Sequence, residues 1–192
     1  MIGLGNIMIF AGDSITQNGG YIDNLREIYP TSLMLNKGIN GYKIFDLEKD
    51  WDNLCLDYDP TVVTILTGVN EVIDTMRGMP DVEKQFEESY SRLIEQTKAR
   101  TQADIILMEP FIMAYPKKLF NWMLVTKRYV NIVDRLAEKY NTGLVKLWDI
   151  FNQADASQLT TDGIHITPQG HDIISAAWNE EYQRIINSKL PD

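Results

Sequence analysis

Cysteine is almost absent from the 192-residue sequence, which has only Cys55 and therefore no second thiol for an internal disulfide bond. Because Cys55 lies between two leucines, we interpret it as a small buried apolar residue rather than as a nucleophile. A domain of this length buries roughly 70% of the surface of its unfolded chain and needs no covalent cross-link. We therefore expect residues 1–192 to form one domain that packing alone stabilises.

Positive charge is scarce, because 18 lysines and arginines face 27 aspartates and glutamates, which gives a formal net charge of −9. Nucleic acids and anionic membranes attract basic patches, so we expect neither as the main partner. Long apolar runs are missing as well, and no stretch is long enough to span a bilayer. The chain as given does not begin with a basic segment typical of a signal peptide, so we expect a cytoplasmic protein. The sequence leaves the oligomeric state open.

Histidine is also rare, with only His165 and His171 in the chain. Two histidines six positions apart among scattered acids do not form a recognisable ligand set, so we expect no metal. Short glycine turns at residue 12 and at residues 38–41 leave room for a phosphate, and a nucleotide is one alternative ligand. The sequence has neither a Walker A loop nor a G-x-G-x-x-G turn after a strand, so we expect no cofactor.

Short apolar runs alternate with segments of helical periodicity along the chain. The predicted strands are Ile7–Ala11, Ser32–Asn36, Val62–Leu66, Ile105–Glu109 and Gly143–Leu147. Long helices are predicted over 81–100, 122–140 and 167–188, the last with Thr167 as its N-cap and Pro168 as its first residue. This alternation predicts a parallel sheet covered on both faces, and hence a flavodoxin-like, three-layer α/β/α sandwich with about five strands.

Polar residues and glycines follow the predicted strands, at the edge where ligands bind in open α/β sheets. Ser14 follows the first strand, Gly41 ends the turn after the second, and Asn70 follows the third. Asp162 and His165 lie in a longer connection after the fifth strand. We therefore expect these five residues to meet at one edge of the sheet.

Acyl transfer is the chemistry that needs such a set of residues. A serine hydroxyl is a poor nucleophile until a base removes its proton, and histidine is the side chain best suited to exchange protons near neutral pH, which makes His165 the candidate base. Asp162, three residues earlier, is close enough to orient the imidazole ring. Backbone N–H groups at Ser14 and Gly41 and the side-chain amide of Asn70 are candidate donors for the oxyanion.

Four short blocks carry a family resemblance: "GDSIT" (12–16), "GING" (38–41), "GVNE" (68–71) and "DGIH" (162–165). In order and spacing they resemble the blocks of the SGNH, or GDSL, hydrolase family, and the resemblance covers nearly the whole chain. It implies a flavodoxin-like fold and metal-free hydrolysis of esters, thioesters or amides. It also implies that Ser14 is the nucleophile, that Gly41 and Asn70 complete the oxyanion hole, and that Asp162 and His165 act as acid and base.

Two residues depart from the family pattern. The third block usually ends in aspartate, where this chain has Glu71, and the second often has serine where this chain has Asn40. Since neither change removes a catalytic group, we expect both to tune the site rather than to abolish its activity.

Structural roles compete with the catalytic ones at several positions. Ser14 and Gln17 fit a helix capping box, and we assign Asp13 a structural hydrogen-bonding role. Asp162 begins a common turn dipeptide. We interpret His171 as a packing or surface residue in the last helix. The segment 111–122 is predicted to be a loop that shapes a pocket, with Trp122 as a candidate wall.

The sequence thus predicts a carboxylic ester hydrolase for small-molecule esters, acting through Ser14, His165 and Asp162. The acidic composition and the lack of an evident apolar lid favour small acyl groups, with O-acetyl groups of carbohydrates as one candidate. Alternatives are a lysophospholipase or thioesterase of the same family, and a catalytically silent binding module with this fold.

Overall fold

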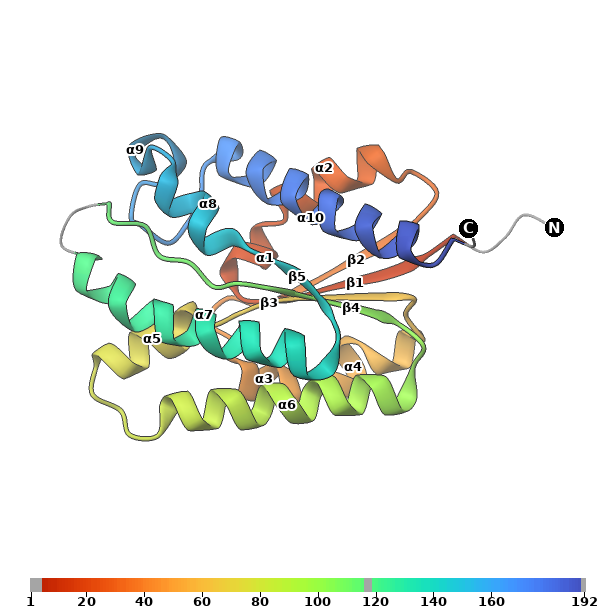
Figure 1. Ribbon diagram of the computed structural model, residues 1–192, viewed down its shortest axis with the longest axis horizontal. Coiled ribbons are helices and arrows are strands. Elements are labelled where there is room, and N and C mark those ends of the chain that lie inside the picture. Colours follow the sequence, from red (N-terminus) through yellow and green to blue (C-terminus); the bar gives the residue numbers. More distant parts are fainter. Residues whose placement is uncertain (1–4, 116–118, 191–192) are drawn as a thin grey trace.

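The computed structural model describes residues 5–115 and 119–190, and its centre is a five-stranded parallel sheet (Figure 1). The strands are β1 (Ile7–Gly12), β2 (Leu33–Gly38), β3 (Val62–Leu66), β4 (Asp104–Met108) and β5 (Gly143–Val145). Their order across the sheet is β2-β1-β3-β4-β5, and every neighbouring pair is parallel. This order brings the carboxyl ends of β1, β2 and β3 together at one edge.

Helices fill the connections between the strands. They are α1 (Ser14–Asn18), α2 (Gly20–Ile28), α3 (Ile44–Lys49), α4 (Trp51–Leu54), the 3₁₀ turn η1 (Leu56–Tyr58), α5 (Val69–Met76), α6 (Val82–Arg100), α7 (Phe120–Tyr140), α8 (Leu147–Gln153), α9 (Ala156–Leu159) and α10 (Pro168–Ser188). Figure 1 shows α2 and α10 on one face of the sheet and α3, α6 and α7 on the other. The predicted three-layer α/β/α sandwich is therefore confirmed.

The middle of the sheet is the apolar core. All five residues of β3 are buried, because both faces of this central strand are covered by helices. Its one polar side chain, Thr64, accepts a hydrogen bond of 2.9 Å from the indole nitrogen of Trp178 on α10. This hydrogen bond holds α10 against the sheet. At the start of the same helix, the Thr167 side chain accepts a hydrogen bond from the amide of Gly170, which confirms the predicted N-cap.

The fifth strand is shorter than predicted. The apolar run Gly143–Leu147 was expected to be a single strand, but pairing ends at Val145 and Leu147 begins α8. Leu147 is fully buried as the first residue of α8, so its apolar side chain belongs to the packing of this helix rather than to the sheet. The Glu109 carboxylate accepts a 2.8 Å hydrogen bond from the amide of Trp148 and holds the first turn of this helix. The other predicted strands differ from the observed ones by two residues or fewer at either end.

Close packing at the carboxyl edge explains Gly38, the first residue of the second block. A Cβ atom on Gly38 would lie 2.2 Å from the backbone nitrogen of Gln17, so only glycine lets the end of β2 pass α1. The Asn36 side chain spans the same gap and donates a 2.8 Å hydrogen bond to the carbonyl oxygen of Thr16. The turn after β2 is thus held against the helix that follows β1.

The predicted loop at 111–122 is only partly a loop. Residues 111–115 have no regular structure, and Phe111 to Met113 are fully buried; residues 116–118 lie outside the described residues. From Phe120 onward the chain is helical, so Trp122 lies in α7, where it packs partly buried against the core. In the described ranges, no helix is long and apolar enough to cross a membrane.

Candidate active site

Ser14 is the first residue of α1, separated from the end of β1 by Asp13 alone. The capping box that competed with the catalytic role of Ser14 does not form, because Asp13 is the N-cap: its Oδ1 accepts from the amide of Ile15 at 3.0 Å. The side chain of Gln17 does not return to the cap; its Oε1 accepts a 2.7 Å hydrogen bond from the amide of Asn40. With capping left to Asp13, the hydroxyl of Ser14 is free for another partner.

That partner is His165, 151 residues later in the chain. The Oγ of Ser14 lies 3.0 Å from Nε2 of His165, and Nδ1 of the same ring lies 2.7 Å from Oδ2 of Asp162. The side chains of His165 and Asp162 are 57% and 49% exposed, so this end of the chain of hydrogen bonds opens to solvent. The structure therefore brings together the three residues that the sequence singled out for nucleophile, base and acid.

Asp162 also stabilises the turn that carries it. Its Oδ1 accepts from the amides of Ile164 and His165 at 2.9 and 2.8 Å, while Oδ2 faces the imidazole ring. Partial burial acts to raise the pKa of Asp162, but these hydrogen bonds outweigh it and hold the pKa below its usual value. An ionised Asp162 accepts a hydrogen bond from Nδ1–H of His165 and so favours the tautomer in which Nε2 is unprotonated and faces Ser14.

Thr160 is a further support of this turn that sequence reasoning missed. It is 1% exposed, and its Oγ1 donates to the carbonyl oxygen of His165 at 2.6 Å. The hydroxyl oxygen of Thr160 also accepts a hydrogen bond from the amide of Gly163 at 2.9 Å. No sequence signal marks Thr160, since its partners become visible only when the turn closes.

Gly41 lies in the turn between β2 and α3, with a φ of +79° that favours glycine. The turn is fixed to the end of β1 by a 3.0 Å hydrogen bond from the amide of Ile39 to the carbonyl oxygen of Gly12. Within residues 5–115 and 119–190, the amide of Gly41 has no hydrogen-bond acceptor. The amide of Ser14, at the first position of α1, likewise has none within its helix.

Asn70 is in the first turn of α5, and it does not occupy the left-handed turn that would be its structural alternative. Gly68, with a φ of +133°, makes that turn instead. The Nδ2 of Asn70 donates a 2.9 Å hydrogen bond to the carbonyl oxygen of Tyr42, next to Gly41. One amide hydrogen of Asn70 is thereby used for orientation, and the second is left to donate to a ligand.

His171 has the packing role expected of it. It is 6% exposed, its Nδ1 accepts from the amide of Tyr21 at 3.2 Å, and its ring stacks on that of Tyr21 with centroids 6.2 Å apart. Burial lowers the pKa of His171 and favours the neutral ring. It also lines a cavity of about 50 Å³ next to Ser14 and His165, together with Ile15, Asn18 and Ile166.

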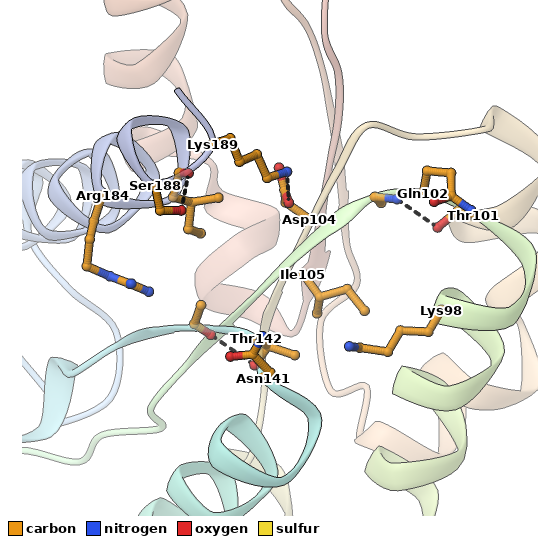
Figure 2. Close-up of a pocket in the computed structure, with 13 residues that line it drawn as sticks. Lys98, Thr101, Gln102, Asp104, Ile105, Asn141, Thr142, Arg184, Ser188 and Lys189 are labelled. Carbon is orange, nitrogen blue, oxygen red and sulfur yellow. Dashed lines mark hydrogen bonds and ion pairs between the residues drawn. The ribbon is translucent and has the colours of Figure 1, made fainter. Parts of the chain in front are cut away.

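A cavity of about 430 Å³ lies elsewhere, at the amino edge of the sheet where β4 and β5 begin (Figure 2). Its cationic groups already have partners: Lys189 pairs with Asp104, Arg184 with Glu181 at 2.6 Å, and Lys98 with the carbonyl oxygen of Tyr140 at 2.5 Å. In the part of the chain that the structure describes, no group of three or more histidine, cysteine or acidic side chains is placed to hold a metal ion.

Comparisons with known proteins find relatives in both sequence and fold. A model of the GDSL-like lipase/acylhydrolase family matches residues 10–173. An acetylxylan esterase of Geobacillus stearothermophilus is 27% identical, over 94% of this chain and 95% of its own. The crystal structure of that species' acetylxylan esterase Axe2 matches with a TM-score of 0.83, at 27% identity and over the same shares of the two chains.

Two further structural likenesses are informative in different ways. LAE5, an alpha/beta hydrolase from the metagenome of Lake Arreo, Spain, covers 92% of this chain and 94% of its own with a TM-score of 0.82; at 23% identity it supports the fold alone. Structures of Axe2 described as catalytic mutants replace a serine, an aspartate and a histidine. In Axe2 the aspartate and the histidine are three positions apart, as Asp162 and His165 are here.

Proposed function

Because the chain belongs to the GDSL-like lipase/acylhydrolase family, we propose that it is a serine esterase that removes acetyl groups from carbohydrate esters. One observation carries this proposal: the unbroken line of hydrogen bonds from Ser14 through His165 to Asp162, with distances of 3.0 and 2.7 Å. These are the distances at which a hydroxyl, a base and an orienting acid act as one unit.

In the first half of the reaction, Nε2 of His165 takes the hydroxyl proton while Oγ of Ser14 attacks the ester carbonyl carbon. Negative charge moves onto the carbonyl oxygen of the tetrahedral intermediate. The amides of Ser14 and Gly41 and the free amide hydrogen of Asn70 donate to that oxygen. As the intermediate collapses, His165 returns its proton to the leaving alcohol, and the acyl group stays on Ser14.

In the second half, water replaces the alcohol. His165 takes a proton from the water as the water oxygen attacks the acyl carbon, and the same oxyanion donors hold the second intermediate. Collapse breaks the bond to Oγ, releases the carboxylic acid and returns the proton to Ser14. Asp162 keeps the imidazole ring in the required tautomer and stabilises its charged form through both steps.

The substrate side of the proposal has two supports. An acetylxylan esterase is similar to this chain over almost its full length. The cavity next to Ser14 and His165 measures about 50 Å³, which holds a small group but no long acyl chain. Since the side chains of His165 and Asp162 are about half exposed, a bulky sugar alcohol can approach from solvent.

The decisive test compares the chain with its Ser14→Ala variant on p-nitrophenyl acetate and on acetylated xylo-oligosaccharides. We expect the variant to lose at least about a thousandfold in kcat/KM while its circular dichroism spectrum is unchanged. Ser91 on α6, whose side chain makes no hydrogen bond with the described residues, supplies the control Ser91→Ala, which should keep full activity. Full activity in Ser14→Ala would overturn the mechanism.

Labelling and chain length separate the remaining alternatives. A fluorophosphonate probe should label the chain, and His165→Ala should abolish the label; an unlabelled chain would indicate a silent binding module. On p-nitrophenyl esters of increasing chain length, kcat/KM should be highest for acetate. A preference for long acyl chains would instead indicate a lysophospholipase or thioesterase.

A further inference from the structure

Glu71, the residue that departs from the family pattern, is a buried carboxyl group in the first turn of α5. It is 3% exposed, and its Oε1 accepts a 2.6 Å hydrogen bond from the amide of Ile44. Its second oxygen, Oε2, is completely buried and has no hydrogen-bond partner among the described residues. Burying a charged carboxylate oxygen without a hydrogen-bond partner costs free energy, so the burial of Oε2 favours the protonated, neutral form of Glu71.

The hydrogen bond from Ile44 fixes one end of the turn that carries Gly41. Ile44 is the first residue of α3, three positions after Gly41, and its amide has no acceptor inside its own helix. Tyr42 lies between Gly41 and Ile44 in the sequence, and its carbonyl oxygen accepts a hydrogen bond from the side chain of Asn70, the residue before Glu71. Two successive residues of α5 therefore hold the backbone that presents the amide of Gly41.

The charged surroundings of Glu71 do not favour an anion. Asp13, the N-cap before Ser14, is 1% exposed, and its Oδ2 also lacks a partner among the described residues. The nearby cation, Lys43, already pairs with Asp74 at 2.5 Å. Other titratable groups near Glu71 are Asp46 of α3, which lines the same cavity, and the phenols Tyr90 and Tyr129. Tyr129 donates to the backbone carbonyl oxygen of Glu71 at 3.3 Å.

We propose that Glu71 is a positioning residue of the esterase site, which holds the Gly41 turn with a carboxyl group kept neutral at physiological pH. A neutral group accepts the hydrogen bond from Ile44 without placing a negative charge behind the oxyanion donors. A charged Glu71, which is 3% exposed and therefore little screened by water, would repel the oxyanion that forms in the transition state. The inference rests on the proposed function, since it assigns Glu71 a part in that reaction.

The electrostatics of the site agree with this assignment. Burial raises the pKa of Glu71 to about 8, against the lowering effect of the hydrogen bond from Ile44. The negative charge of Asp13 acts in the same direction as burial, and Lys43 opposes it only weakly. The group should therefore ionise at mildly alkaline pH, where the change can be measured in the folded enzyme.

The first test is the pH profile of kcat for the wild-type chain and for Glu71→Gln. Glutamine keeps the acceptor for Ile44 and cannot ionise, so its kcat at about pH 7 should stay within about threefold of wild type. Above a pKa of about 8 the wild-type kcat should fall, by about tenfold one pH unit higher, while Glu71→Gln keeps its rate. An alkaline fall shared by both chains, or a Glu71→Gln variant inactive at pH 7, would overturn the proposal.

Asp74→Asn is the matched control. It removes a neighbouring carboxylate from the same helix and breaks the pair with Lys43, but it leaves Glu71 in place. Because Asp74→Asn frees Lys43, whose charge favours the Glu71 carboxylate, the alkaline fall should persist at the pH of the wild-type fall or below it. If Asp74→Asn also abolished the fall, the titrating group would be the Lys43–Asp74 pair and the assignment to Glu71 would be wrong.

A second variant, Glu71→Met, tests positioning. Methionine fills a similar volume but accepts no hydrogen bond from Ile44, so kcat should drop at least tenfold while KM changes less than about threefold. A loss of thermal stability with an unchanged kcat would show a merely structural role. If Glu71→Met does not fold, the pH comparison with Glu71→Gln still decides.

A spectroscopic readout separates this inference from the proposed activity. Infrared difference spectra between about pH 7 and about pH 10 should show protonated carboxyl absorption that disappears at high pH, part of it from Glu71 and part from Glu109, whose pKa is raised to about 7. The Glu71 band, defined as the wild-type difference spectrum minus that of Glu71→Gln, should be present in full in Ser14→Ala. If the Glu71 band is present but the chain has no esterase activity, the proposed function is wrong and the neutral Glu71 is supported. If the chain is an active esterase but the band is missing, the proposed function is supported and the neutral Glu71 is wrong.

Discussion

The amide of Met113 donates a 2.8 Å hydrogen bond to the carbonyl oxygen of Gly163, which joins the segment after β4 to the turn that carries Asp162 and His165. Gly163 has a φ of +89°, and a Cβ atom there would lie 2.2 Å from Cδ1 of Leu119 and 2.6 Å from the carbonyl oxygen of Tyr115. The position of His165 thus depends on a site that admits only glycine.

Gly163→Ala is therefore expected to displace the turn. Because a backbone oxygen is in the way, relief requires the turn to move, and kcat should fall at least tenfold while the melting temperature drops by several degrees. Gly78 provides the control: its φ is +80°, but no atom lies within 4 Å of its Cβ position. Gly78→Ala should lose comparable stability from backbone strain and keep its kcat, and equal losses of kcat in both variants would contradict the argument.

Asp162→Asn should lower kcat by about 10²–10⁴-fold with little effect on KM, because an amide neither fixes the tautomer of His165 nor stabilises its charged form. Steady-state kinetics on p-nitrophenyl acetate measure this. Asp155→Asn is the comparison, since Asp155 caps α9 shortly before the same turn and touches no residue of the triad. The role given to Asp162 would be untenable if its substitution were no more harmful than that of Asp155.

Gln17 should contribute through the turn that contains Gly41. Its Oε1 is the acceptor for the amide of Asn40, so Gln17→Ala removes a side-chain support without touching the nucleophile. We expect a kcat reduced about three- to thirtyfold and a nearly unchanged melting temperature. Gln96→Ala on α6 controls for loss of a glutamine whose side chain makes no hydrogen bond with the described residues. Unaltered kinetics in Gln17→Ala would show that the turn needs no such support.

Glu109 should make stability depend on pH. Burial, together with the neighbouring Asp134, raises the pKa of Glu109 to about 7, above the value of 4.5 that it has when unfolded. The folded chain then binds this proton more tightly, so its contribution to stability is complete below about pH 4.5 and is lost as the pH rises through about 7. Glu109→Gln should therefore melt at a higher temperature than wild type at about pH 8, with a smaller gain at about pH 5.

Thermal melts at both pH values test this prediction. Asp13 and Glu71 also have raised pKa values, so the wild-type chain should lose stability toward alkaline pH, and Glu109→Gln should reduce that slope without removing it. Glu138→Gln, at an exposed position of α7, should leave the slope unchanged. The reverse order, with the variant gaining more at pH 5, would contradict the sign of the shift.

The sequence predicted the layers, and the three side chains that lie together at the carboxyl edge, better than it predicted the residues that support them. The alternation of apolar runs with helical spacing is a property of the chain itself, and it yielded five strands in the right places. Where a run such as Gly143–Leu147 could continue as strand or turn into helix, only the packing of Leu147 decided. Ser14, His165 and Asp162 were found because their chemistry requires particular residue types.

Supporting residues carry no such requirement. The choice of Asp13 rather than Ser14 as the cap of α1 depends on backbone angles at the end of β1. Thr160 and Gln17 act through hydrogen bonds to backbone atoms of other segments, which any folded arrangement could pair differently. Glu71 was noticed only as a departure, and its contact with Ile44 appears when α5 meets α3.

The 151 residues between Ser14 and His165 also set the order in which activity can arise as the chain is made. Ser14 leaves the ribosome 151 residues before His165 does. In the proposed mechanism, a chain in which α10 has not yet docked beside α2 holds a serine without its base and cannot cleave esters. Ester hydrolysis is thus a direct reporter of completed folding, and the rate at which it appears during refolding measures the docking of the last helix.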